Sequence, residues 1–195
     1  MRVLAIDPSL RGTGYAILEA AEPAGASRNG NGDGARRPQA TATVALLGMP
    51  LRARSCEYGT IKNKSALLPS SCLVAIHDRL AELIHRHEPD CCAVEGVIFV
   101  QSHRTAITLG AARGAAILAA AERGLPVYEY APREVKQAVV GRGGAEKSQV
   151  AFMVRALLGL TETPPPDAAD ALAIGLTHLR AQSSPLTKVQ ALARI

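Results

Sequence analysis

Short apolar runs alternate along the chain with longer segments of helical periodicity. RVLAID at 2–7, CCAVEG at 91–96 and PVYEY at 126–130 are typical of buried strands. The segment at 13–20 follows the first run after a glycine-containing turn, so we expect an antiparallel hairpin. The partial alternation at 51–63 indicates a further strand.

Helical spacing follows these strands. A helix is predicted over 68–87, with Ser70 or Ser71 as its N-cap, because five apolar residues recur three and four positions apart: Leu73, Ile76, Leu80, Leu83 and Ile84. Further helices are predicted over 104–123, 132–140, 145–159 and 167–182. Small residues at Gly110, Ala111, Gly114 and Ala115 suggest close packing of the second helix against the sheet, and Phe152 is interpreted as a core residue.

The order of these elements predicts an α/β fold. Its mixed central sheet combines an antiparallel hairpin with parallel crossovers and is flanked by helices. A chain of 195 residues with 48% apolar content is long enough for one sizeable core. We therefore expect a single domain over 1–182 and a C-terminal tail over 183–195. Residues 22–42 are rich in Gly, Asn, Pro and Arg and are interpreted as a flexible insertion.

Charge and cysteine usage narrow the functional classes. A surplus of 22 basic over 17 acidic residues, net +5, favours a polyanionic partner such as nucleic acid. Asp7 interrupts the first apolar run and no later segment is long enough to span a bilayer, so we expect a cytoplasmic protein without a membrane partner. The four cysteines lack zinc-site spacing and are interpreted as reduced, structural residues.

Four carboxylates are the candidate catalytic and metal-binding residues: Asp7, Glu95, Asp167 and Asp170. Asp7 and Glu95 each end a predicted buried strand, where an ionised side chain is costly without a counter-charge. Asp167 and Asp170 share one helical turn, although acids at a helix start also act as simple caps. Carboxylates without His or Cys suit Mg²⁺ or Mn²⁺, and a two-metal site of this kind hydrolyses phosphodiesters.

Basic and aromatic residues near these acids are candidate DNA contacts. Lys136, Arg142 and Lys147 surround the glycine-rich segment GRGG at 141–144 and can meet backbone phosphates, or can simply form a solvated basic face. GRGGAEKS differs from a phosphate-binding P-loop because Glu146 precedes the lysine. Phe99 follows Glu95 in a loop and either stacks on unpaired bases or packs internally. His178 lies about 16 Å along the helix from Asp167 and is interpreted as structural.

Four blocks together resemble the RuvC family of Holliday-junction resolvases: IDPSLRGTGYAI, AVEGVIF, VKQAVVG with AEKSQVAFMVRALLGL, and DAADALAIGLTH. The resemblance implies a ribonuclease H-like fold and a homodimer that makes paired symmetric nicks in four-way junction DNA. It implies a branch-migration helicase complex as a further partner. It also places the four carboxylates at the family's metal-binding positions, with about two Mg²⁺ ions per subunit. Lys136 and Lys147 match basic positions near the scissile strand, and Phe99 matches a base-wedging position.

Other functions remain open at this stage. The same fold acts on structured RNA in some relatives, and a non-catalytic junction-binding protein would leave the acids unused. An actin-like sugar kinase is also conceivable from IDPSLRGTG, but the chain lacks room for a second lobe. The chain differs from residues that are frequent in the RuvC family at Ser9, Leu10 and Gly96. None of these differences changes a carboxylate.

Overall fold

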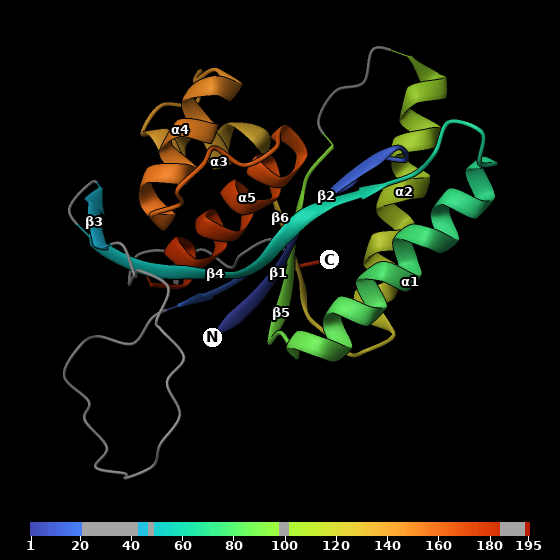
Figure 1. Ribbon diagram of the computed structural model, residues 1–195, viewed down its shortest axis with the longest axis horizontal. Coiled ribbons are helices and arrows are strands. Elements are labelled where there is room, and N and C mark those ends of the chain that lie inside the picture. The colour runs from blue at the N-terminus through green and yellow to red at the C-terminus, as the bar shows by residue number, and fades with distance from the viewer. Residues whose placement is uncertain (21–42, 47–48, 98–101, 184–193) are drawn as a thin grey trace, which may run out of the picture.

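The computed structural model describes residues 1–20, 43–46, 49–97, 102–183 and 194–195, with the backbone alone described over 43–46 and 49–52 (Figure 1). The predicted insertion at 22–42 therefore lies outside the described residues. In chain order the elements are β1 (Arg2–Asp7), β2 (Gly12–Ala20), β3 (Thr43–Leu46), β4 (Met49–Lys62), α1 (Pro69–His87), β5 (Cys91–Glu95), α2 (His103–Ala121), β6 (Val127–Tyr130), α3 (Pro132–Val140), α4 (Lys147–Leu158) and α5 (Pro166–Ser183).

The strands form one mixed sheet in the order β3-β4-β2-β1-β5-β6. β1 pairs with β2 and β2 with β4 in antiparallel ladders, whereas β1–β5 and β5–β6 are parallel. The predicted combination of an antiparallel hairpin and parallel crossovers is confirmed. β3 was not predicted from the sequence, because its four residues are too few to establish an alternating pattern.

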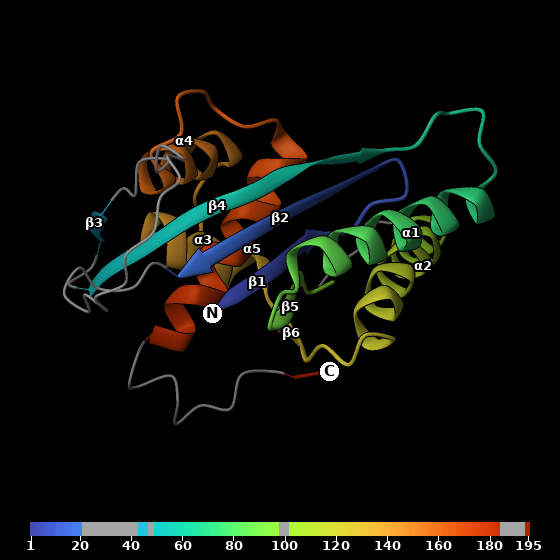
Figure 2. The ribbon, with the colours of Figure 1, turned by 60° about the horizontal axis from the view of Figure 1, so that its bottom comes forward.

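The sheet is covered on both faces (Figure 2). Val3 and Ala5 of β1 belong to the core shared with α3, α4 and α5, whereas Leu4 and Ile6 belong to the core shared with α1 and α2. This alternation follows from the opposite direction of successive side chains in a strand. Two separate cores therefore hold β1 from either side, which fixes the position of the acid at its end.

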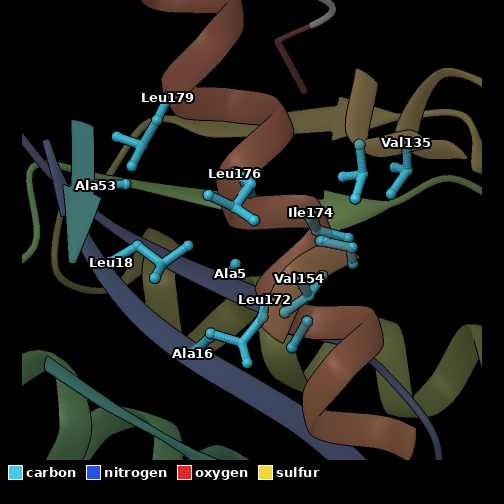
Figure 3. Packing of buried hydrophobic residues seen from close by; sticks show 14 of the residues in the cluster. Ala5, Ala16, Leu18, Ala53, Val135, Val154, Leu172, Ile174, Leu176 and Leu179 are labelled. Carbon is cyan, nitrogen blue, oxygen red and sulfur yellow. The ribbon is translucent and has the colours of Figure 1, made fainter. Parts of the chain in front are cut away.

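Helix α5 is buried almost all round between the sheet and the pair α3 and α4 (Figure 3). A side chain at Gly175 would place its Cβ only 2.5 Å from Leu18 Cδ1 and 3.2 Å from Ala5 Cβ. Glycine there allows the helix to approach β1 and β2 closely. The residues of α5 are thus held at a fixed depth against the sheet.

Three details differ from the sequence prediction. α2 exposes most of the small residues that were expected to face the sheet, and buries Ala112, Ala116, Ala119 and Ala120 instead. A helix built almost wholly of small apolar residues shows no alternation between polar and apolar faces, so its buried face cannot be identified from the sequence. Phe152 is 63% exposed, because Val150 and Val154 occupy the buried face of α4 and Phe152 points away from both. Neither predicted serine caps α1, since Pro69 begins the helix and Leu68 is its N-cap.

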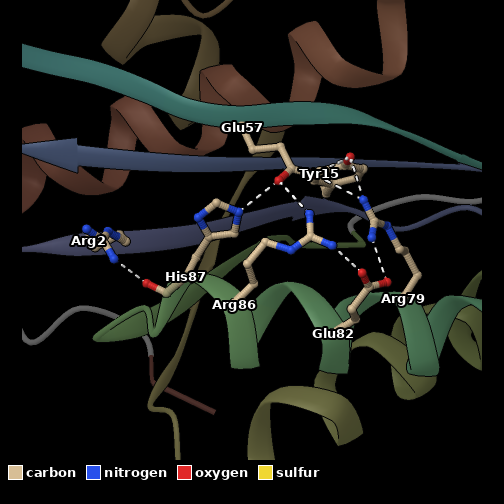
Figure 4. A network of polar contacts seen from close by, with 7 residues as sticks. All are labelled: Arg2, Tyr15, Glu57, Arg79, Glu82, Arg86 and His87. Carbon is tan, nitrogen blue, oxygen red and sulfur yellow. Dashed lines mark hydrogen bonds and ion pairs between the residues drawn. The ribbon is translucent and has the colours of Figure 1, made fainter. Parts of the chain in front are cut away.

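A network of ion pairs and hydrogen bonds connects α1 to the sheet (Figure 4). Glu57 of β4 accepts from Arg79 and Arg86 of α1, and lies 2.8 Å from His87 Nε2. Tyr15 of β2 donates to the same carboxylate at 3.1 Å. Partial burial acts to raise the pKa of Glu57, but the hydrogen bonds with His87 and Tyr15 and the nearby positive charges outweigh it, so the pKa is lowered.

All four cysteines are free thiols, and burial raises the pKa of Cys91 to about 12, which agrees with a structural role. Arg194 forms a bridge with Tyr128 at the free edge of β6. The division between a domain over 1–182 and a tail over 183–195 stays a prediction. Among the described helices, none has the length and apolarity needed to cross a bilayer.

Candidate active site

Two of the four predicted carboxylates stand at the ends of neighbouring strands. β1 and β5 run parallel, with Ile6 opposite Val94, so Asp7 and Glu95 emerge side by side at one edge of the sheet. Both side chains are partly buried, each at the end of a fully buried run. The carboxyl ends of parallel strands are where α/β folds place their ligands.

The third carboxylate, Asp167, is positioned by glycines of β2. Gly14 is the ladder partner of Asp7, and a Cβ added at Gly14 would overlap the main-chain oxygen of Asp167, with the carbonyl carbon only 2.6 Å away. A Cβ at Gly12 would lie 2.8 Å from Asp167 Oδ2. These contacts bring the first turn of α5 against the hairpin beside Asp7.

The charges of the four carboxylates are coupled. Burial and, after it, the charges of Glu95, Asp170 and Asp167 together raise the pKa of Asp7 to about 7, against the lowering effect of Lys147. Burial and the charge of Asp170 also raise the pKa of Glu95, against the lowering effect of Lys147 and Lys136. The structure therefore gathers all four predicted acids into one electrostatic cluster with a deficit of positive charge.

Helix capping does not account for Asp167 and Asp170. Within the described residues, neither side chain accepts a hydrogen bond from a backbone N–H of α5. Asp170 instead accepts from Lys147 Nζ at 2.9 Å, and this bond raises the pKa of the lysine. The capping bonds are not made, although Asp167 still lies in the first turn of α5, where the helix dipole favours an acid, so metal binding by the two acids stays a prediction.

A pocket of about 450 Å³ opens beside Asp7 and Glu95. Of the predicted DNA-contact residues, Lys136 lines this pocket, and Lys147 reaches the acids from α4. Arg142 is exposed and donates to Gln149 Oε1 at 2.8 Å, outside the pocket. Phe99 lies outside the described residues.

Two arginines of the pocket were missed by the sequence analysis. Arg113 of α2 lines the pocket and forms an ion pair with Glu129 of β6. Arg133 lines it from the first turn of α3, three residues before Lys136. That spacing puts both basic side chains on one face of a helix and was the available signal for Arg133.

His178 serves the core, as expected from its distance along α5. It is fully buried, with Tyr130 Oη 2.8 Å from Nδ1 and Cys91 Sγ 3.2 Å from Nε2. Burial lowers its pKa to about 4, so the imidazole is neutral at physiological pH. It links α5 to β5 and β6 without joining the carboxylate cluster.

The donor set fits hard divalent cations. Four carboxylates whose charges disfavour one another, with no His or Cys among them, are the ligand type that Mg²⁺ and Mn²⁺ take. In the part of the chain that the structure describes, no three acidic, His or Cys side chains are already close enough to hold an ion. Mutual repulsion of like charges and the Lys147–Asp170 bond are consistent with that separation.

Comparison with known proteins identifies the family of this chain. The sequence profile of the family described as crossover junction endodeoxyribonuclease RuvC matches residues 46–178. The chain belongs to the RuvC family. The RuvC of Akkermansia muciniphila is 51% identical over 179 residues, covering 92% of this chain and 90% of the relative. The RuvC of Caldicellulosiruptor saccharolyticus is 38% identical and covers 95% and 96% of the two chains.

Solved structures agree with the RuvC assignment. Thermus thermophilus RuvC is 34% identical with a TM-score of 0.75, and covers 100% of both chains. T. thermophilus RuvC in complex with Holliday junction substrate gives 33% identity and a TM-score of 0.76, covering 100% of this chain and 99% of that one. The yeast mitochondrial Holliday junction resolvase Ydc2, at 11% identity and a TM-score of 0.55, shares the fold. The predicted ribonuclease H-like class is confirmed.

Membership defines the reaction class. RuvC proteins are crossover junction endodeoxyribonucleases, so this chain is a metal-dependent nuclease that hydrolyses phosphodiester bonds in DNA. The enzymatic interpretation of the sequence is thereby confirmed, and the kinase alternative is excluded.

The cluster of four carboxylates predicts an unusual pH dependence of the free energy of unfolding. Because the folded-state pKa of Asp7 is raised from 3.8 to about 7, its contribution to stability is present at low pH and is lost as pH rises through 7. In EDTA, Asp7→Asn should therefore melt higher than wild type at pH 7.5. At pH 5 the difference in free energy of unfolding between the two proteins should be smaller by about 2 kcal/mol. That change corresponds to a difference in melting temperature of roughly 4–8 °C.

Thermal melts of both proteins at the two pH values check this expectation. Addition of Mg²⁺ should close the gap at pH 7.5, because cation binding stabilises wild type more than the variant. An Asp7→Asn variant that melts below wild type in EDTA at pH 7.5 would contradict the repulsion inferred for the cluster.

Proposed function

We propose that this chain resolves Holliday junctions by paired symmetric nicks, and that Asp7, Glu95, Asp167 and Asp170 together hold two Mg²⁺ ions per subunit, for which Mn²⁺ substitutes. The observation that carries the proposal is the convergence of acids from β1, β5 and α5: Asp7 ends β1 beside the end of β5, and its ladder partner Gly14 packs against Asp167. The presence of a Holliday junction in the complex of the T. thermophilus relative supports the choice of substrate.

The residues have separate tasks in this reaction. When bound, the ions activate a water molecule and stabilise the leaving oxygen of the scissile phosphodiester. Asp7 and Glu95 give the site its rigid base, because each is anchored by a buried strand. Asp167 and Asp170 supply further carboxylates from the deeply packed α5.

Lys147 has a role in balancing charge. Its ammonium group, on a side chain that is 81% exposed, offsets part of the negative charge by its bond to Asp170. Cations held by the four carboxylates would supply this charge instead and would leave Lys147 available to the DNA backbone. Lys136 faces the same pocket as Glu95 and contacts a phosphate there, while Arg142 supplies a more distant backbone contact. Phe99 stacks on an unpaired base at the junction.

Symmetric incision requires two active sites, which a homodimer provides. Support comes from one exposed face of α2, where small and apolar residues recur at helical spacing: Ile107, Gly110, Ala111, Gly114 and Leu118. Ile107 is 73% exposed and Leu118 52%, and a Cβ at Gly110 or Gly114 would meet nothing within 4 Å. A second copy of α2 fits such a face closely.

The dimer has a direct test. Gly114→Arg should shift the protein from dimer to monomer in sedimentation velocity runs at micromolar concentration, without altering its far-UV circular dichroism. A wild-type protein that sediments as a monomer while cleaving both strands would contradict the dimer.

We further propose association with a branch-migration helicase and a cytoplasmic location, both of which rest on family resemblance.

The choice of substrate is tested by a side-by-side cleavage assay. A synthetic DNA four-way junction, a linear duplex of the same sequence and an RNA four-way junction are incubated with the protein and Mg²⁺. We expect incision of the DNA junction at symmetric positions and little cleavage of the other two. Indiscriminate nicking of duplex would refute junction specificity, and preferential RNA cleavage would support the structured-RNA alternative.

A further inference from the structure

Three basic residues line the pocket beside Asp7 and Glu95, but they are not equivalent: Arg113, Arg133 and Lys136. Arg113 is neutralised by its ion pair with Glu129. Within the described part of the chain, Arg133 makes no ion pair or hydrogen bond with another residue. Its charge is therefore available to a ligand in the pocket.

The place of Arg133 on α3 also favours an anion. Arg133 lies in the first helical turn, directly after Pro132. The N-terminus of a helix carries partial positive charge, which Glu134 in the same turn partly offsets, and this end of α3 attracts an anion in the pocket. The same dipole adds to the attraction of an arginine for phosphate. The guanidinium group is also the side chain best matched to two phosphate oxygens.

The glycine-rich loop fixes where this side chain lies. A Cβ added at Gly143 would sit 2.5 Å from Arg133 Cγ and 3.0 Å from Nε. Cγ is close to the root of the side chain, so any larger residue at 143 forces Arg133 into another rotamer. At the neighbouring Gly144 an added Cβ meets nothing within 4 Å.

We propose that Arg133 binds a backbone phosphate of the cleaved strand next to the scissile phosphate, and that Gly143 holds its guanidinium in the pocket. The site is shared with Asp7 and Glu95, so a phosphate held there positions the strand for hydrolysis. This inference rests on the proposed function, since it names a second contact of the same substrate. It assigns to Gly143 a positioning role toward Arg133.

Junction cleavage under single-turnover conditions tests the proposal. Arg133→Gln and Gly143→Ala should each slow cleavage about tenfold, as expected for loss of one charge-assisted contact. Arg133→Lys should fall between wild type and Arg133→Gln. Gly144→Ala is the matched control and should cleave like wild type. Melting curves of all variants confirm that each is folded.

Two further readouts separate phosphate binding from a general structural effect. The double variant Arg133→Gln/Gly143→Ala should be no slower than Arg133→Gln alone, because Gly143 acts only through Arg133. A neutral methylphosphonate at a phosphate flanking the cleavage position should slow wild type about tenfold and Arg133→Gln very little. The salt dependence of junction binding should lose about one unit of slope in Arg133→Gln.

Other outcomes overturn the inference. Equal rates for wild type and Gly143→Ala, or additive losses in the double variant, would show that Gly143 does not position Arg133. A methylphosphonate effect of equal size in wild type and Arg133→Gln would show that no flanking phosphate is bound there. A wild-type protein that cleaves no junction would instead refute the proposed function itself.

Discussion

Asp7→Asn and Glu95→Gln should each reduce the rate of junction cleavage by at least about a thousandfold, while junction binding survives. Each amide keeps the shape of the side chain but removes the charge that a cation requires. Both residues end strands that are buried on either side, so no neighbouring acid can move into their place. Cleavage is measured with a labelled junction in Mg²⁺, and binding by gel shift in EDTA.

Glu162→Gln is the matched control for this prediction. Glu162 is exposed in the connection before α5, and the described residues include no partner for its side chain. Its variant should cleave at the wild-type rate. Substantial cleavage by Asp7→Asn in Mg²⁺ would contradict the metal-binding role of the cluster.

Gly14→Ala should be strongly destabilising and should also abolish cleavage. The added Cβ would overlap the backbone of Asp167, so either the start of α5 or the hairpin must move. Overpacking against main-chain atoms costs about 3 kcal/mol or more, a large share of the stability of a domain. Urea denaturation followed by circular dichroism measures the loss of stability.

A graded comparison separates the effect on the site from the effect on the fold. In Gly12→Ala the only close contact would be with Asp167 Oδ2, at 2.8 Å, since Asp167 Cγ and Thr60 Cγ2 lie at ordinary contact distances of 3.6 and 3.7 Å, and the carboxylate can rotate away. This variant should therefore lose most of its cleavage activity with a much smaller loss of stability. A Gly14→Ala protein as stable and active as wild type would show that α5 does not pack as the structure describes.

The parts of the site that could be predicted from the sequence depend on local patterns. Asp7 and Glu95 were recognisable because an apolar run that ends in an acid is unusual for a buried strand. The sequence predicted parallel crossovers but not which strands pair; in the structure, the parallel pairing of β1 with β5 brings the two residues together. The resemblance of the surrounding blocks to RuvC added the junction substrate, which the acids alone do not specify.

The parts that could not be predicted depend on contacts through space. Nothing in the sequence indicates that Gly14 receives the backbone of Asp167, because the two residues meet only after α5 docks on the hairpin. The buried face of α2 was also misassigned, since small residues on all sides leave no helical contrast. The exposure of Phe152, in contrast, was predictable from the sequence, because Phe152 follows Val150 by two positions, which on a helix places it on the opposite face.

The most direct test of the central claim is a Mg²⁺ titration of cleavage on a single synthetic four-way junction, with both incision positions mapped. We predict no cleavage in EDTA and a rate that rises more steeply than first order in Mg²⁺, as expected for two ions at four carboxylates. The nicks should fall at symmetric positions on opposite strands and leave ends that ligase can join. Full-strength junction binding with no cleavage in either Mg²⁺ or Mn²⁺ would contradict the account.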